Sequence, residues 1–137
     1  MKTQVKPNKK QEYIHINEII RHYHNQRFAQ LTLWLAITAV LLSVLFGKTY
    51  NVTPIAAISL KLIGIIASIV FWVMDQRMVD HWRYFWQRAK QLESDLGFQM
   101  WQYRPKRTLL GSTNATRLLY GAVTVFWLFT LFFPSFF

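Results

Sequence analysis

Three long apolar runs, separated by polar segments, dominate the sequence. They cover residues 28–47, 54–74 and 116–134. A membrane-spanning helix needs about 20 mostly apolar residues, because each residue advances about 1.5 Å through a hydrocarbon layer roughly 30 Å thick. The first run carries no charged residue and the second carries one, Lys61. The pattern therefore predicts an all-α membrane protein with three transmembrane helices.

The polar segments between these runs also carry helical patterns. In residues 1–27, a basic N-terminus leads into a short amphipathic helix for which Asn17 is a suitable N-cap. After the second run, no proline or glycine occurs before Gly97, so we expect this helix to continue out of the membrane as a cytoplasmic extension over residues 75–97. Residues 98–115 contain proline and glycine and predict an interfacial connection.

The positive charges indicate the orientation in the membrane. Residues 1–27 hold six lysines and arginines and residues 75–117 hold eight, out of 16 in the whole chain. Cytoplasmic loops of membrane proteins carry this excess. We therefore expect an inner (plasma) membrane protein whose N-terminus and 75–117 region are cytoplasmic, with the C-terminus external. The same rule accounts for the net charge of +10, and we expect no nucleic-acid partner.

A second periodicity marks one face of the second apolar run and its extension. Polar or small residues with spacings of three and four occur in the membrane half, and mainly apolar ones follow in the cytoplasmic half. A period of 3.5 residues keeps one face toward a partner helix. That partner lies either in the same chain or in a second copy, and we expect a homo-oligomer. The residues of this face are Ala57, Lys61, Gly64, Ser68, Phe71 and Asp75, then Met78, Trp82, Phe85, Ala89, Leu92 and Leu96.

Lys61 and Asp75 are the two charged residues on the membrane half of this face. Lysine inside a transmembrane helix costs about 2.5–3.5 kcal/mol on insertion scales. Lys61 therefore either faces a water-filled path or an interhelical partner, or extends its ammonium to the outer interface. In a pore built from several chains it would form a positive ring that favours anions. Asp75 can pair with Arg27, Arg77 or Arg117.

Candidate chemistry outside this face is sparse. The chain has no cysteine, and its four histidines lie beside no carboxylate cluster or HExxH motif. We therefore expect no catalytic site, no metal and no cofactor, and we do not expect an enzyme. Aromatic and basic residues in the connection indicate contact with anionic lipid headgroups. The basic residues of this lipid contact are Arg104, Lys106 and Arg107.

One stretch resembles a pattern of small bacterial inner-membrane proteins, in which a span ends in an aromatic-rich segment and passes into a cytoplasmic helix. The matching residues are Phe71, Trp72, Asp75, Arg77, Ala89, Leu92, Glu93, Leu96 and Gly97. The resemblance covers residues 71–130. The layout is also similar to the helical membrane effectors of anti-phage defence systems, which implies a pore-forming, antiviral role.

Two functional hypotheses follow. The first is an oligomeric protein that acts on the bilayer as a pore, channel or membrane-perturbing effector gated by its cytoplasmic helices. The second is a non-conducting membrane adaptor or scaffold that recruits a cytoplasmic protein through residues 75–115.

Overall fold

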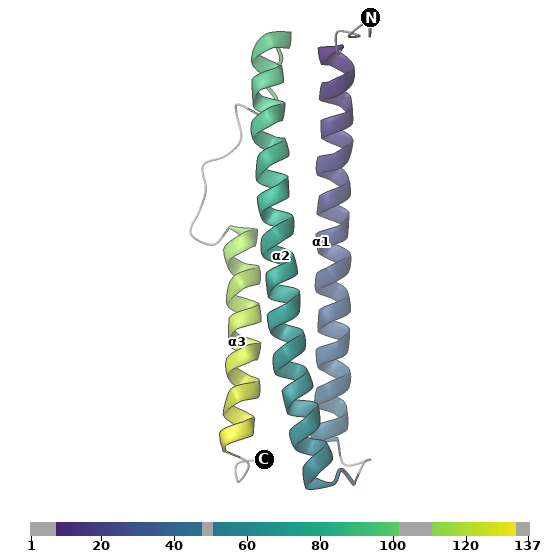
Figure 1. Cartoon of the computed structure of the whole chain (residues 1–137), viewed down its shortest axis with the longest axis vertical. Helices are drawn as coiled ribbons and strands as arrows, with labels where there is room; N and C mark the ends of the chain where they lie inside the picture. The colour runs from purple at the N-terminus through teal and green to yellow at the C-terminus, as the bar shows by residue number, and fades with distance from the viewer. Residues whose placement is uncertain (1–7, 48–50, 102–110, 134–137) are drawn as a thin grey trace, which may run out of the picture.

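The computed structural model describes residues 8–47, 51–101 and 111–133. Over these ranges the chain is all-helical, with α1 (Lys9–Phe46), α2 (Pro54–Leu96) and α3 (Ser112–Phe132) and no strand. The three helices run side by side: α1 accompanies α2 along its length, and α3 lies beside the half of α2 that follows the α1–α2 connection (Figure 1). Each helix is long and apolar enough to cross a membrane.

α1 is one continuous helix that starts earlier than the sequence predicts. Its N-cap is Asn8, whose side-chain oxygen accepts a hydrogen bond of 3.1 Å from the backbone N–H of Lys10. The prediction of a cap at Asn17 is therefore wrong. The Asn17 amide instead donates to the carbonyl of Tyr13 at 3.0 Å. The helix starts early because no proline or glycine interrupts residues 9–27, and because this stretch packs against α2.

α2 is a single helix of 43 residues, which corresponds to about 65 Å. It begins at Pro54, a residue suited to a first helical turn, and Thr53 accepts a hydrogen bond from the N–H of Ala56. It ends before Gly97, whose φ of 73° lies in the left-handed region that favours glycine. α3 begins at Ser112, so the expected interfacial connection over residues 98–115 ends earlier than predicted.

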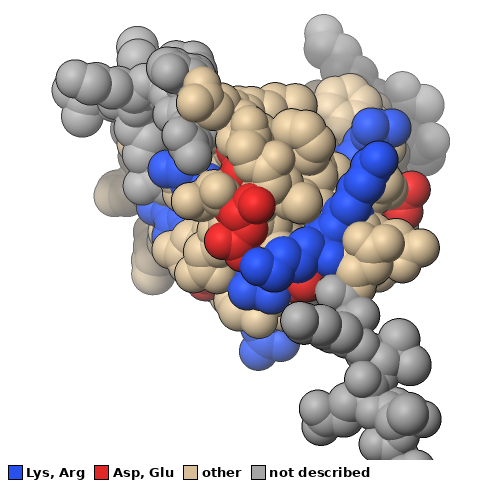
Figure 2. Space-filling view, turned by 90° about the horizontal axis from the view of Figure 1, so that it is seen from above, with Lys and Arg blue, Asp and Glu red and all other residues tan. Residues whose placement is uncertain are grey.

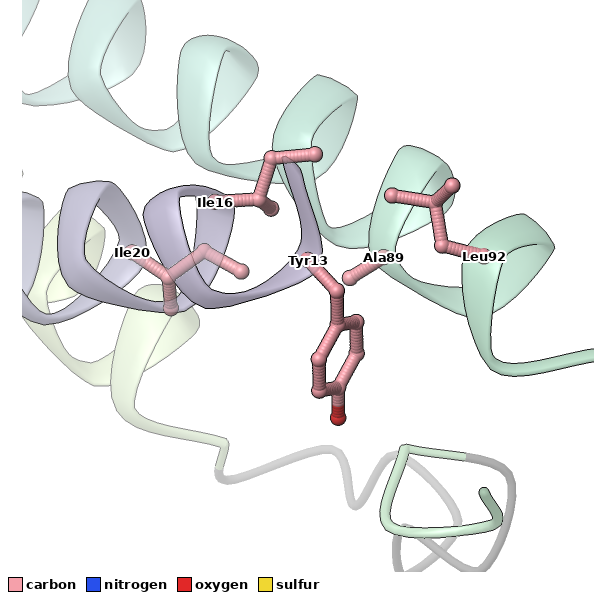
Figure 3. Close-up of a cluster of buried hydrophobic side chains, with 5 residues drawn as sticks. All are labelled: Tyr13, Ile16, Ile20, Ala89 and Leu92. Carbon is pink, nitrogen blue, oxygen red and sulfur yellow. The ribbon is translucent and has the colours of Figure 1, made fainter. Parts of the chain in front are cut away.

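Two different cores hold the helices together. In the half without α3, Tyr13, Ile16 and Ile20 of α1 pack on Ala89 and Leu92 of α2 (Figure 3). This is an apolar hairpin core. Two ion pairs join the start of α1 to the last turns of α2 at the end of this core. They are Lys9–Asp95 and Arg88–Glu12, both at 2.8 Å. Viewed from this end, basic and acidic side chains lie next to one another (Figure 2). In the other half, the residues buried among the three helices include several polar ones.

Candidate functional site

Polar side chains line the interior of the three-helix half, and we call them the polar column. All three helices contribute to it. Most of its members are more than nine-tenths buried. Polar groups inside a membrane-spanning bundle are costly, and they often mark pathways for ions or protons. The polar column comprises Arg27, Gln30 and Trp34 of α1, Lys61, Ser68 and Asp75 of α2, and Tyr120 and Thr130 of α3.

One end of the polar column is an ion pair between α1 and α2. Arg27 donates from Nε to Oδ1 of Asp75 at 2.6 Å and from Nη2 to Oδ2 at 3.2 Å. The Arg27 Nη1 also lies 3.5 Å from the Thr113 hydroxyl at the start of α3. The Asp75 side chain is 2% exposed and that of Arg27 is 20% exposed. A two-point contact of this kind is strong and directional.

The structure thereby selects one of the three partners that the sequence leaves open for Asp75. Arg117 lies nearby but donates to Oε1 of Gln76 instead, at 3.0 Å from its Nε. Arg77 is an exposed residue of α2. Arg27 is therefore the guanidinium that neutralises the buried carboxylate.

The middle of the column is made by α1 and α3 residues that the sequence analysis does not single out. The Gln30 amide donates to the carbonyl of Phe71 at 2.8 Å, and the Trp34 indole N–H lies 3.4 Å from the Ser68 hydroxyl. The rings of Trp34 and Tyr120 meet edge to face, with centroids 4.5 Å apart. The Gln30 side chain also interacts with the buried Tyr120 hydroxyl.

The other end of the column joins Lys61 to the end of α3. The Lys61 Nζ donates to the Thr130 carbonyl oxygen at 2.6 Å, and the Lys61 residue is 8% exposed. Thr130 lies in the last turn of α3, where carbonyls lack helical partners. Residue 134, whose N–H would otherwise complete this bond, is a proline without one. Lys61 therefore caps the negative end of the α3 dipole.

Gly64 lies between the two ends and is in close contact with α3. A Cβ at this position would lie 2.6 Å from Cε2 of Trp127, so only glycine fits against the ring as it stands. Trp127 is fully buried, and its indole N–H has no hydrogen-bond partner among the described residues.

The column residues on α1 and α3 share helical spacing. Gln30, Trp34, Thr38 and Leu41 are the buried residues of α1 in this half, and Tyr120, Trp127 and Thr130 are those of α3. Separations of three, four and seven residues bring side chains to one face of a helix. The same periodicity test that identifies the α2 face would have found them.

The second half of the predicted α2 face, from Met78 to Leu96, packs within the chain. Ala89 and Leu92 are buried against α1, and three more of its members are partly buried there. Met78 lines a small cavity of about 40 Å³ between the three helices. The partly buried members are Trp82, Phe85 and Leu96. The described contacts of this face therefore lie within one chain, and the homo-oligomer stays a prediction.

Glu93 is a buried carboxylate at the end of this hairpin. It is 0% exposed, although the sequence shows it only as one of the charged residues beside the apolar stripe. The Tyr13 hydroxyl donates to its Oε1 at 2.8 Å, and the backbone N–H of Trp101 lies 3.1 and 3.0 Å from its two oxygens. Burial and the hydrogen bond to Glu93 raise the pKa of the Tyr13 phenol. Glu93 thus ties the turn after α2 to the hairpin.

The proposed lipid-contact residues Arg104, Lys106 and Arg107 lie outside the described residues. Within the described part of the chain, no group of three His, Asp or Glu side chains is placed to hold a metal ion. Comparison with protein-family models, with curated proteins and with solved structures finds no match to this chain.

Proposed function

We propose that this chain is an integral protein of the plasma membrane with a cytoplasmic N-terminus and an external C-terminus. The membrane-crossing parts are then residues 28–46 of α1, residues 54–74 of α2, and α3. Residues 9–27 and 75–96 form the helical hairpin that projects into the cytoplasm. Two observations support this placement: all three helices are apolar enough to cross a membrane, and basic residues concentrate in the N-terminal segment and after residue 74.

This topology predicts which side of the membrane is open to chemical labelling. The chain has no cysteine, so single substitutions can be labelled without background. Asn51→Cys, at an exposed site in the α1–α2 connection, should react with a membrane-impermeant maleimide in intact spheroplasts. Ser94→Cys, at an exposed site on the hairpin, should react only after lysis. The reverse pattern would invert the proposed orientation.

With this placement, the protein acts on the bilayer as a pore or channel, and this structure is its closed state. The polar column is the path that ions follow. From Asp75 to Lys61 the column extends about 21 Å along α2, which is about two-thirds of a hydrocarbon layer of roughly 30 Å. Charged and amide side chains inside a membrane oppose insertion, and a passive anchor does not need them. The polar interior shared by all three helices is the observation that carries this proposal.

The charges of the column favour an anion as the permeating ion. Arg27 and Asp75 neutralise each other at one end. Lys61 at the other end has a carbonyl partner, which carries no formal charge. The column therefore has one net positive charge, and positive groups in a narrow path attract anions. The path runs within one chain, so it does not require a ring of Lys61 residues from several copies.

Flux through reconstituted protein tests this function. Purified wild type in liposomes should pass chloride in preference to potassium. Lys61→Met should lose this preference, because it removes the net charge of the column. Leu62→Met, on the exposed face of the same turn of α2, is the matched control and should behave as wild type. If folded wild type and a variant whose path is held open both pass neither ion, with or without an applied potential, the conduit is excluded.

The adaptor is the second candidate, and the cytoplasmic hairpin is the observation that favours it. An open groove of about 440 Å³ is lined by Glu12, Tyr84, Gln87, Arg88 and Gln91. Tyr84 is 67% exposed there, and exposed aromatic residues are common where proteins bind partners. If the liposomes remain silent and Tyr84→Ala abolishes the protein's biological effect in cells, the adaptor is the better description.

A further inference from the structure

Between Lys61 and Ser68, an aromatic ring of α3 occupies the polar column. Gly64 lies between the polar residues Lys61 and Ser68 on α2. Along the helix axis it is about 4.5 Å from Lys61, three residues away, and about 6 Å from Ser68, four residues away. At this level the fully buried ring of Trp127 lies directly against Gly64. We propose that Trp127 in contact with Gly64 is the closed gate of the conduit, an inference that rests on the proposed function.

The contact closes the path because it leaves no room between α2 and α3. The ring is so near that a single added carbon at residue 64 would lie 2.6–2.9 Å from three of its atoms. The aromatic neighbour Phe126 contacts the same ring, with centroids 5.5 Å apart. An ion leaving Lys61 toward Ser68 therefore meets the Trp127 indole, whose Cε2, Cδ2 and Nε1 atoms lie nearest Gly64 and fill the space. Apolar constrictions close ion paths by excluding water.

The gate can open because few bonds hold the ring in place. The Trp127 indole N–H has no hydrogen-bond partner among the described residues, so withdrawing the ring breaks only apolar contacts with Gly64 and its surroundings. In this part of the bundle α3 is held to α2 by the bond from Lys61 to the Thr130 carbonyl, three residues beyond Trp127.

Movement of α3 away from α2 therefore has two coupled effects. It withdraws the Trp127 ring from Gly64, and it separates the Thr130 carbonyl from the Lys61 ammonium. The ammonium is then free to attract an anion into the path that has just opened. The gate and the selectivity group thus respond to one displacement of one helix.

A pair of glycine substitutions tests the gate. Gly64→Ala places a methyl group where it clashes with the Trp127 ring. Gly121→Ala on α3 is the matched control, because a Cβ there meets nothing within 4 Å. Chloride flux through Gly64→Ala liposomes should rise about tenfold or more over wild type, since about 1.4 kcal/mol of closed-state destabilisation changes the open population by that factor. Gly121→Ala should match wild type.

A distance measurement in the same liposomes separates failure of the gate from failure of the function. Spin labels on Ile58→Cys of α2 and Phe132→Cys of α3, both exposed, should lie farther apart in Gly64→Ala than in wild type. If the labels lie farther apart in Gly64→Ala but its chloride flux equals a measurable wild-type flux, the gate alone is overturned. Wider separation with every variant silent would overturn the conduit and the gate together. Unchanged separation and unchanged flux would show that a Cβ at residue 64 does not displace the ring, so the contact with Gly64 is not the closure.

Trp127→Ala is the second variant if Gly64→Ala does not fold. It removes the ring itself and should also raise chloride flux, whereas Trp127→Phe, which keeps an aromatic ring, should raise it less. Equal flux in wild type, Trp127→Ala and Trp127→Phe, each folded and conducting, would overturn the gate.

Discussion

Asp75→Ala should lower the free energy of unfolding by about 3 kcal/mol, because it leaves the Arg27 guanidinium inside the bundle without a counter-charge. Breaking a buried ion pair from one side costs about 3–5 kcal/mol. The lower end applies here since the Arg27 side chain keeps 20% exposure. Unfolding in detergent, followed by the helical circular dichroism signal, measures the loss.

Two further variants identify the cause. Asp80→Ala removes an exposed pair with Arg83, 3.5 Å apart on the surface of α2, and should cost less than about 1 kcal/mol. Combining Asp75→Leu with Arg27→Met replaces the buried pair by apolar groups and should recover most of the stability. If the double variant is as unstable as Asp75→Ala, the loss comes from packing and the ion pair is not its origin.

Lys61→Glu should release the end of α3 and cost about 3 kcal/mol or more, whereas Lys61→Met should be close to neutral. A glutamate would bring a carboxylate to the Thr130 carbonyl, at the negative end of the helix dipole, with two acceptors facing each other. Methionine loses a charge-assisted hydrogen bond of about 1.5–3 kcal/mol. It also removes the lysine insertion cost of about 2.5–3.5 kcal/mol, so the two changes nearly cancel.

The same spin-label pair on Ile58→Cys and Phe132→Cys provides the measurement. Lys61→Glu should lengthen and broaden the distance distribution between α2 and α3, and Lys61→Met should leave it near wild type. Lys61→Arg is the control that keeps the positive charge. If Lys61→Glu gives a wild-type distance and unfolding curve, the ammonium does not cap α3, and Lys61 extends to the outer interface instead.

The elements of this fold can be predicted from local rules. Apolar run length identifies the three helices, and the absence of proline and glycine between Gly64 and Gly97 keeps α2 continuous. Gly97 ends it because the left-handed conformation is easiest for glycine. Such rules depend on neighbours in the chain, so one sequence is enough. They are weakest at helix starts, so they placed the N-cap of α1 at Asn17, whereas the cap is Asn8.

The partners of the polar residues could not be predicted in this way. Lys61 and Asp75 were recognisable as costly residues on one face of α2, but several arginines were equally suitable partners for Asp75. A backbone carbonyl in α3 was not a visible partner for Lys61. Which groups meet depends on the rotation and height of one helix against another, and these are set by packing between residues far apart in the chain.

Three apolar helices, the extent of α2 and the segments that carry the positive charge are predictable before any fold is known, because they follow from composition and spacing along one chain segment. The pairing of Arg27 with Asp75, the cap of Lys61 on α3, the burial of Glu93 and the contact of Trp127 with Gly64 appear only in the folded chain. Each of these contacts joins residues at least 48 positions apart or depends on a neighbouring helix that covers the side chain.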